Sequence, residues 1–171
     1  APWLLADDHK VTVFDSMLFG GGAQWDSHNP RVIKGDVRDI RSVADAMAGQ
    51  DAVIWLASLS NNAMCEKFQQ IAERVNRDAV PTALLWARKA GVRRFIYASS
   101  VAAYGSTERP VAEWKTLKPS TPYGEAKKYA EGWVQTYNSD AMVTCIVRSA
   151  SVCGYSVHQR FDLTVNMMVH D

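Results

Sequence analysis

The chain has 171 residues, of which 47% are hydrophobic and 22% charged, and these proportions are ordinary for one soluble globular domain. Its 19 basic and 18 acidic residues leave a net charge of +1, and no apolar run reaches the roughly 18 residues of a membrane span, so we expect a small-molecule partner rather than nucleic acid or a membrane. The 3 cysteines show no CxxC spacing and the 4 histidines match no metal-ligand pattern, so we expect reduced cysteines, a cytoplasmic protein and no metal site.

Short apolar runs alternate with segments of helical spacing along the chain. Residues 1–6 read as the end of an amphipathic helix, and the apolar runs predict strands at 11–14, 31–34, 52–57, 94–98 and 143–147. Helical spacing predicts helices at 39–48, in one or two segments between about 64 and 90, and at 122–137. Pro81 either begins the second of those segments or kinks one long helix. Gly20–Gly22 and residues 105–121 are expected to be loops.

This alternation predicts an α/β fold with a parallel sheet covered by helices on both faces. In such folds a ligand binds beyond the carboxyl ends of the strands. Polar residues follow the predicted strands at that edge: Asp15, Asp36, Ser58, Ser100 and Ser149. We therefore expect the functional site there.

Tyr123 and Lys127 form a YxxxK pair at the start of a predicted helix, where residues four apart share one face. A free tyrosine has a pKa of about 10 and is a poor base at neutral pH, whereas a nearby ammonium favours the phenolate. Tyr123 could then take a proton from a substrate hydroxyl while hydride leaves the same carbon, with Ser100 holding the reacting oxygen. Ordinary helix surfaces also carry this spacing, so the pair is informative because it follows a strand that ends in Ser99 and Ser100.

Landmarks in chain order resemble the extended short-chain dehydrogenases/reductases, and more narrowly the NAD-dependent nucleotide-sugar epimerase/dehydratase family. They are Asp36 in Gly-Asp-Val-Arg-Asp, Asn76 in Val-Asn-Arg-Asp-Ala, the segment 91–100, Tyr104-Gly105, the segment 122–127 and Arg148. The resemblance runs through nearly the whole chain. It implies a Rossmann-like doubly wound parallel sheet, NAD as the cofactor, a nucleotide sugar as the substrate, and a homodimer formed by helices at about 70–90 and 122–138.

Carried over to this sequence, the resemblance implies that Ser100, Tyr123 and Lys127 are catalytic. It implies cofactor contacts for Asp15, Asp36, Val37, Leu56, Ala57, Ser58, Asn76, Ser99, Tyr123, Lys127 and Ser149, and substrate contacts for Ser100, Ser151 and Asn166. Asp15 would bind the adenosine ribose, and its charge would favour NAD over NADP; the alternative is an ordinary aspartate at a strand end. Asn76 would be a structural hydrogen-bonding residue beneath the cofactor; the alternative is a tolerated surface asparagine.

Two departures from the family pattern shape the interpretation. Only residues 1–14 precede Asp15, whereas the family's Gly-rich turn lies about 20 residues before the acidic residue, and most of a substrate domain is also missing. We therefore interpret the sequence as an incomplete record, with residues 1–152 as an NAD-binding domain that lacks its first strand and Gly-rich turn, and residues 153–171 as the start of a substrate-binding region.

The second departure concerns the reaction. The family's 4,6-dehydratases usually carry an acidic pair directly after the catalytic Ser or Thr, whereas Val101, Ala102 and Ala103 follow Ser100. This favours an epimerase that acts through a transient 4-keto sugar. A nucleotide-sugar dehydrogenase/reductase, a 4,6-dehydratase and a non-catalytic NAD-binding protein of the same fold stay open as alternatives.

Overall fold

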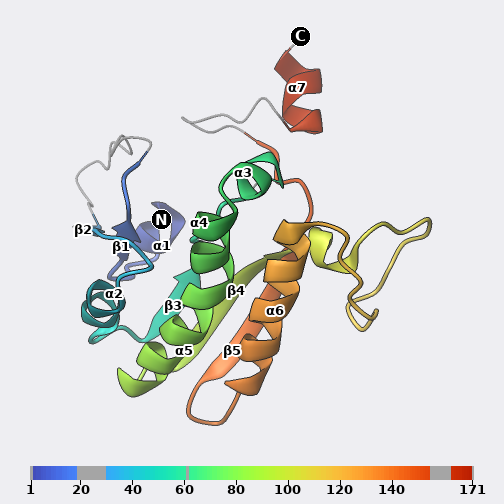
Figure 1. Cartoon of the computed structure of the whole chain (residues 1–171). Helices are drawn as coiled ribbons and strands as arrows, with labels where there is room; N and C mark the ends of the chain where they lie inside the picture. Colours follow the sequence, from blue (N-terminus) through green and yellow to red (C-terminus); the bar gives the residue numbers. More distant parts are fainter. Residues whose placement is uncertain (1, 19–29, 61, 155–162, 171) are drawn as a thin grey trace.

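The computed structural model describes residues 2–18, 30–60, 62–154 and 163–170 (Figure 1). The strands are β1 (Thr12–Asp15), β2 (Arg31–Lys34), β3 (Ala52–Trp55), β4 (Arg94–Ser100) and β5 (Val143–Ser149). The helices are α1 (Pro2–Ala6), α2 (Ile40–Met47), α3 (Asn62–Lys67), α4 (Gln69–Glu73), α5 (Ala79–Lys89), α6 (Pro122–Thr136) and α7 (Thr164–His170), with a π-helical turn η1 (Arg74–Asp78) and a 3-10 turn η2 (Val101–Tyr104). The predicted strands and helices therefore form, while Gly20–Gly22 lies outside the described residues.

In the described part of the chain, all the strand pairs are parallel, and they form two sheets, β1–β2 and β3–β4–β5. β4 is the central strand of the larger sheet, and it pairs with β5 as far as Ser100 opposite Ser149. A doubly wound sheet of order 3-2-1-4-5-6 has one more strand between the positions that β1 and β3 occupy here. No strand among the described residues fills that position. The chain thus has the strand order of a Rossmann-like fold, divided into two sheets.

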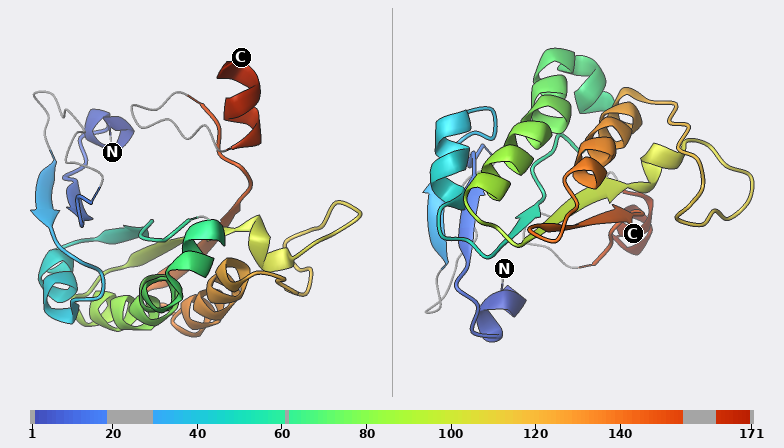
Figure 2. Two further views of the ribbon diagram at one scale, coloured as in Figure 1. Left: turned by 45° about the horizontal axis from the view of Figure 1, so that its top comes forward. Right: turned by 90° about the horizontal axis from the view of Figure 1, so that it is seen from below.

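Helices α2, α5 and α6 lie together on one side of the strands (Figure 1, Figure 2). The core lies between them and the sheet, and its fully buried members include Leu84, Phe95, Tyr97 and Val134. Side chains on the opposite face of the larger sheet remain exposed: Ile54, Leu56, Val143 and Val147. We expected helices on both faces; in the described part of the chain only one face of β3–β4–β5 is covered, because no described helix packs over those four side chains.

Helix ends follow the capping residues of the sequence. Asp39 caps α2 by accepting a hydrogen bond from the backbone N–H of Arg41, and Thr121 caps α6 through the N–H of Gly124. The segment 64–90 is broken at Phe68, and from Gln69 to Lys89 it is one continuous helix that contains the π-helical turn η1. Pro81 therefore does not begin a second helix but lies within one long helix, in the first turn of α5 just after η1. Both β4 and β5 run two residues beyond their predicted ends, which places Ser99 and Ser100 within β4.

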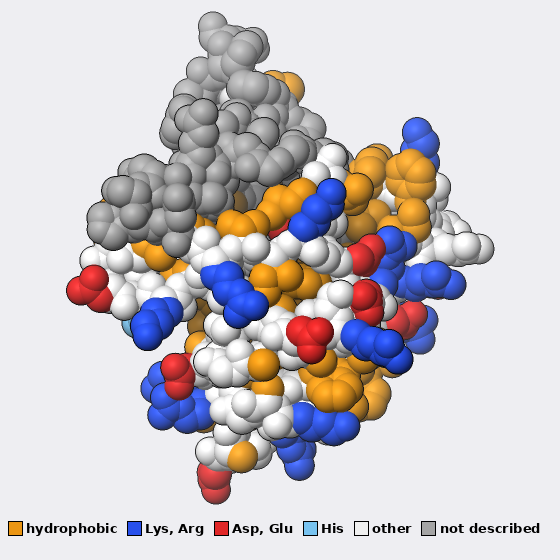
Figure 3. Space-filling view, turned by 90° about the vertical axis from the view of Figure 1, so that its left-hand side faces the viewer, with side chains coloured by type: hydrophobic (Ala, Val, Ile, Leu, Met, Phe, Trp, Pro, Cys, Tyr) orange, Lys and Arg blue, Asp and Glu red, His pale blue; other side chains and the backbone are white. Residues whose placement is uncertain are grey.

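The surface agrees with the balanced charge of the sequence. Seen from the side of β1, β2 and α2, the described face intersperses positive, negative and hydrophobic side chains (Figure 3). Among the described residues, no helix is long and apolar enough to cross a membrane, and no group of three His, Cys, Asp or Glu side chains could hold a metal ion.

Candidate active site

The candidate site lies where β4 ends. Ser100 is the last residue of β4 and the N-cap of η2, with an extended backbone, and its Oγ accepts a hydrogen bond of 3.2 Å from the N–H of Ala102. The turn that follows therefore fixes the hydroxyl group at the carboxyl end of the central strand. This is the edge at which parallel α/β sheets bind their ligands.

The first turn of α6 lies directly against η2. Gly124 makes this close approach possible: a Cβ atom at this position would lie 2.5 Å from the carbonyl oxygen of Ala102. Tyr123 precedes Gly124, and Ser100 precedes η2. The contact between the two backbones thus brings the tyrosine turn and the serine turn together, although they lie more than twenty residues apart in the sequence.

Lys127 is buried one turn after Tyr123. Its side chain is only 2% exposed, and its Nζ donates a hydrogen bond of 2.8 Å to the carbonyl oxygen of Ala98. The same Nζ lies 5.5 Å from the ring centroid of Tyr123 and 4.9 Å from that of Tyr97. Burial lowers the pKa of Lys127 to about 8. The ammonium therefore lies next to Tyr123, as the spacing of the sequence predicted, and the structure also fixes it to β4 two residues before Ser100.

The expected cofactor residues after β3 are organised by Asn76. This side chain is 1% exposed, so the alternative of a surface asparagine is wrong. Its Oδ1 accepts hydrogen bonds from Ser58 Oγ (3.0 Å) and the N–H of Leu59 (2.8 Å), and its Nδ2 donates to the carbonyl oxygen of Leu59 (3.0 Å). Asn76 thus holds the β3–α3 loop in place. Before that loop, Leu56 is exposed and Ala57 packs against the core.

Two acidic residues follow the strands of the smaller sheet. Asp15 is exposed at the end of β1, and its Oδ1 accepts a hydrogen bond of 2.7 Å from the N–H of Met17. Asp36 follows β2, and hydrogen bonds from the Arg38 side chain lower its pKa. The half-buried Val37 packs against the core. Each carboxylate therefore stands at the carboxyl end of a strand, and that of Asp36 is already paired.

The remaining expected residues are placed less closely. Ser149 is half-buried opposite Ser100, and Ser151 is exposed just beyond β5. Asn166 belongs to α7, which stands apart from α6 in Figures 1 and 2. The structure therefore brings Ser149 to the end of β4 beside Ser100 but does not place α7 against the candidate catalytic residues Ser100, Tyr123 and Lys127.

A buried acid on α6 escaped the sequence analysis. Glu131 is 1% exposed, it accepts hydrogen bonds from the hydroxyl of Ser99 and from the Arg148 guanidinium, and it lies eight residues after Tyr123 on the same helical face. Ser99, which we expected at the cofactor, thus directs its hydroxyl into the helix-covered side of the sheet. The signal in the sequence was an acidic residue one turn after Lys127, on the helical face that also carries Ala130 and Val134.

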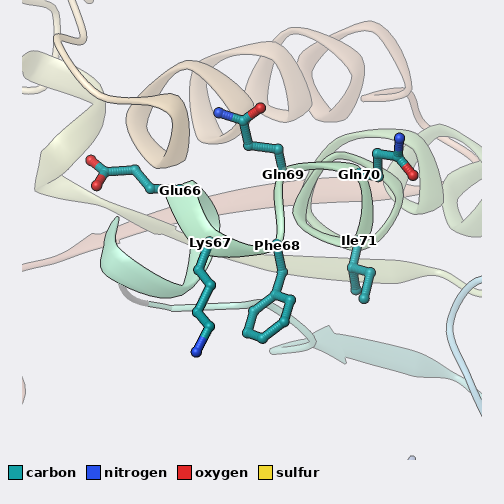
Figure 4. A pocket seen from close by; sticks show the side chains of 6 residues that line it. All are labelled: Glu66, Lys67, Phe68, Gln69, Gln70 and Ile71. Carbon is teal, nitrogen blue, oxygen red and sulfur yellow. The ribbon is translucent and has the colours of Figure 1, made fainter.

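Two hollows on the surface lie elsewhere. A pocket of about 280 Å³ surrounds the junction of α3 and α4, where Lys67 and Phe68 point to one side and Gln69 to the other (Figure 4). A groove of about 440 Å³ runs between η1 and α6. Asn76 lines the groove, but Ser100, Tyr123 and Lys127 line neither hollow, so neither contains the candidate catalytic residues.

The family of the chain is decided by a match over nearly its whole length. The model of the NAD dependent epimerase/dehydratase family matches residues 1–170. The chain belongs to this family. The resemblance seen in the sequence and the Rossmann-like fold are therefore confirmed, and NAD is the cofactor on which the family depends.

Relatives in the family act on more than one class of substrate. The chain is 28% identical over 149 residues to a dTDP-glucose 4,6-dehydratase of Streptomyces niveus, a match that covers 79% of this chain and 43% of the relative. It is 34% identical over 107 residues to a UDP-glucose 4-epimerase of Streptomyces lividans, a match that covers 55% of this chain and 30% of that relative. It is 29% identical over 133 residues to a 3 beta-hydroxysteroid dehydrogenase/Delta 5-->4-isomerase of Mycobacterium tuberculosis, a match that covers 72% of this chain and 36% of that relative. The chain thus spans less than half the length of these relatives.

A solved structure with bound NAD shares the fold. It is a short-chain dehydrogenase/reductase superfamily protein from Agrobacterium tumefaciens, 31% identical in sequence, with a TM-score of 0.72 over 86% of this chain and 43% of that one. Its bound NAD makes it relevant to ask which residues of this chain could contact the same cofactor.

Proposed function

We propose that the protein is an NAD-dependent epimerase of a nucleotide sugar and that it works through a transient 4-keto intermediate. The observation that carries the proposal is the convergence of Ser100, Tyr123 and Lys127 at the end of β4, with the Lys127 ammonium fixed by Ala98 and 5.5 Å from the Tyr123 ring. Three residues from two separate elements have no structural need to meet in this way.

The residues present suit NAD at both of its ends. The exposed Asp15 carboxylate at the end of β1 offers two acceptor oxygens for ribose hydroxyls, and the edge near Asp36 and Val37 would take the adenine. The path from there toward Tyr123 would be lined by Ser58, by Ser149 and by the backbone of Ser99. The described residues contain no Gly-rich turn between a strand and a helix for the pyrophosphate, so the fit concerns the two ends of the cofactor.

Each of the three residues has a defined task in the reaction. NAD, when bound, would supply the hydride-transfer chemistry at the sugar carbon. The Tyr123 phenolate takes the proton from the C4 hydroxyl and later gives it back to the keto oxygen. The Lys127 ammonium stabilises the phenolate by its charge, and its own side chain is nearly closed to water. The Ser100 hydroxyl donates a hydrogen bond to the reacting oxygen and holds it toward Tyr123.

The residues after Ser100 favour epimerisation over dehydration. Elimination of water needs an acid or a base beside the neighbouring carbon, whereas η2 begins with Val101, Ala102 and Ala103. A dehydrogenase is the second candidate, because the same three residues serve simple oxidation and because one relative is named as a hydroxysteroid dehydrogenase. A homodimer through the helices at 70–90 and 122–138 and a cytoplasmic location stay predictions.

The test is to incubate the purified protein and NAD with a panel of UDP- and dTDP-sugars and a 3β-hydroxysteroid. We expect C4 epimers to interconvert without net NADH. Accumulating NADH would instead favour the dehydrogenase, and a 4-keto-6-deoxy sugar the dehydratase. Tyr123→Phe removes the proton-transferring hydroxyl, so it should lower kcat by at least about 1,000-fold while the Kd for NAD stays within about threefold. Turnover that survives this substitution would contradict the mechanism.

A further inference from the structure

Arg148 on β5 and Glu131 on α6 form a buried ion pair behind the candidate site. Nε of Arg148 lies 2.9 Å from Glu131 Oε1, and Nη2 lies 2.7 Å from Oε2, which is a two-pronged contact. The side chains are 14% and 2% exposed. The hydroxyl of Ser99 on β4 donates a further hydrogen bond to Glu131. The carboxylate thus joins α6 to both β4 and β5.

The other end of the same guanidinium reaches past the sheet. Nη1 of Arg148 donates hydrogen bonds of 2.8 Å to the Tyr104 hydroxyl and 2.8 Å to the carbonyl oxygen of Glu113. The guanidinium also lies 4.9 Å from the centroid of the Tyr104 ring. Tyr104 ends η2, and Glu113 belongs to the long loop that leads to α6. The Arg148 side chain therefore contacts both η2 and the long loop, the two segments that connect Ser100 to Tyr123.

We propose that Glu131 and Arg148 are positioning residues, and that their buried pair fixes how α6 docks on β4 and β5 and thereby where Tyr123 stands relative to Ser100. Ser99, which bonds Glu131, is adjacent to Ser100, and in the strand register Arg148 lies opposite Ser99. Glu131 lies two helical turns from Tyr123 along a rigid helix. An error in the docking of α6 at this pair would carry through to the phenol.

Stability alone gives no reason to bury these two charges. An apolar pair of similar volume in the same place is often as stable as a buried ion pair, or more stable, because the charges must lose their water. Hydrogen bonds of fixed direction, however, allow one docking geometry where apolar side chains allow several. The pair therefore specifies a position, and the burial of Ser99 and Glu131, with the Arg148 side chain 14% exposed, distinguishes it from the exposed Arg93–Asp51 pair.

The proposal rests on the proposed function, and its test separates a positioning role from a structural one. The triple variant Ser99→Ala/Glu131→Leu/Arg148→Met replaces the network by apolar side chains and leaves no buried carboxylate without a partner. We expect its melting temperature to stay within about 5 °C of that of the wild type and its Kd for NAD within about threefold, while kcat falls about 100-fold. A kcat within threefold of the wild type would overturn the proposal.

A matched control lies on the same helix. Val134 is fully buried three residues after Glu131 and belongs to the apolar core. Val134→Ala should lower the melting temperature by several degrees and leave kcat unchanged. If the triple variant does not fold, Glu131→Gln, which keeps the volume, serves instead, and we expect it to lower kcat about 10-fold without a change in KM.

A second readout needs no turnover. A 3-fluorotyrosine placed at position 123 reports the surroundings of the phenol through its ¹⁹F line. We expect this line to shift or broaden in the triple variant and to stay in place in Val134→Ala. An unchanged line in the triple variant would overturn the positioning role. A wild-type protein that turns over no nucleotide sugar would overturn the proposed function instead, and the ¹⁹F line would still decide the positioning role.

Discussion

Replacing Lys127 by methionine removes a buried ammonium and should stabilise the fold while abolishing activity. The side chain is 2% exposed, and burial lowers its pKa from the usual 10.5 to about 8. Because one pKa unit corresponds to about 1.4 kcal/mol, the charged form costs the fold about 3 kcal/mol near neutral pH. The substitution also loses the hydrogen bond to the Ala98 carbonyl, and this loss offsets about 1 kcal/mol of the gain in stability. We therefore expect Lys127→Met to raise the free energy of unfolding by about 2 kcal/mol near pH 7.

The sign of the pH dependence follows from the direction of the shift. The folded-state pKa of Lys127 lies below its unfolded value, so the unfolded chain binds more protons between about pH 8 and 10.5 and the stability rises with pH in this window. The penalty is fully present below about pH 8 and is relieved as the pH rises through the window. The advantage of Lys127→Met should accordingly disappear near pH 10.

Guanidinium unfolding of both proteins at about pH 7 and pH 10 measures this difference, and groups that titrate in both proteins cancel. Lys128→Met is the matched control, because Lys128 is the next residue on α6 and is exposed. We expect the control to change the free energy of unfolding by less than about 0.5 kcal/mol at either pH. A Lys127→Met advantage that is absent at pH 7, or is equally large at pH 10, would refute the electrostatic reasoning.

Two further pairs of variants test the packing beneath the site. Gly124→Ala places a methyl group 2.5 Å from the carbonyl oxygen of Ala102, so we expect it to lower the stability by about 2 kcal/mol and kcat about 100-fold. Gly132→Ala is the control, because Gly132 lies on the same helix with open space around it, and this substitution should raise the stability by about 0.5–1 kcal/mol. Equal effects of the two substitutions on kcat would contradict the role of the close approach. Asn76→Ala removes the hydrogen bonds between the β3–α3 loop and the buried amide, so thermal unfolding should show a loss of about 2–3 kcal/mol in stability. The exposed Asn138→Ala should cost about 1 kcal/mol, and equal losses would mean that burial of the amide does not matter.

Most of the fold follows from local patterns in the sequence. The apolar, β-branched runs predict the five strands of the described residues, because such side chains favour strand structure. The ends of β4 and β5 were predicted two residues early, since Ser99 and Ser100, and likewise Arg148 and Ser149, are polar. These residues remain in the ladder because β4 and β5 pair with each other to the end. Strand pairing is a long-range property, and a local pattern does not contain it.

The candidate site divides in the same way. The YxxxK spacing places Tyr123 and Lys127 on one face because helix geometry is local. The ion pair of Glu131 and Arg148 joins residues 17 positions apart, and it depends on how α6 docks on β5. The coverage of only one face of the larger sheet could not be predicted either, since apolar side chains on an exposed strand face look the same in sequence as those under a helix.

The π-helical turn η1 has a consequence for comparing this chain with its relatives. A π turn accommodates one residue more than the α-helical path around it, and one residue corresponds to about 100° of rotation. Val75 and Asn76 are consecutive yet both buried, and the helical phase of α4 does not continue into α5. An insertion or deletion of one residue within 74–78 would therefore leave the loops unaltered but turn the Asn76 amide away from Leu59. In a protein lineage, this short segment would tolerate substitution far better than a change of length.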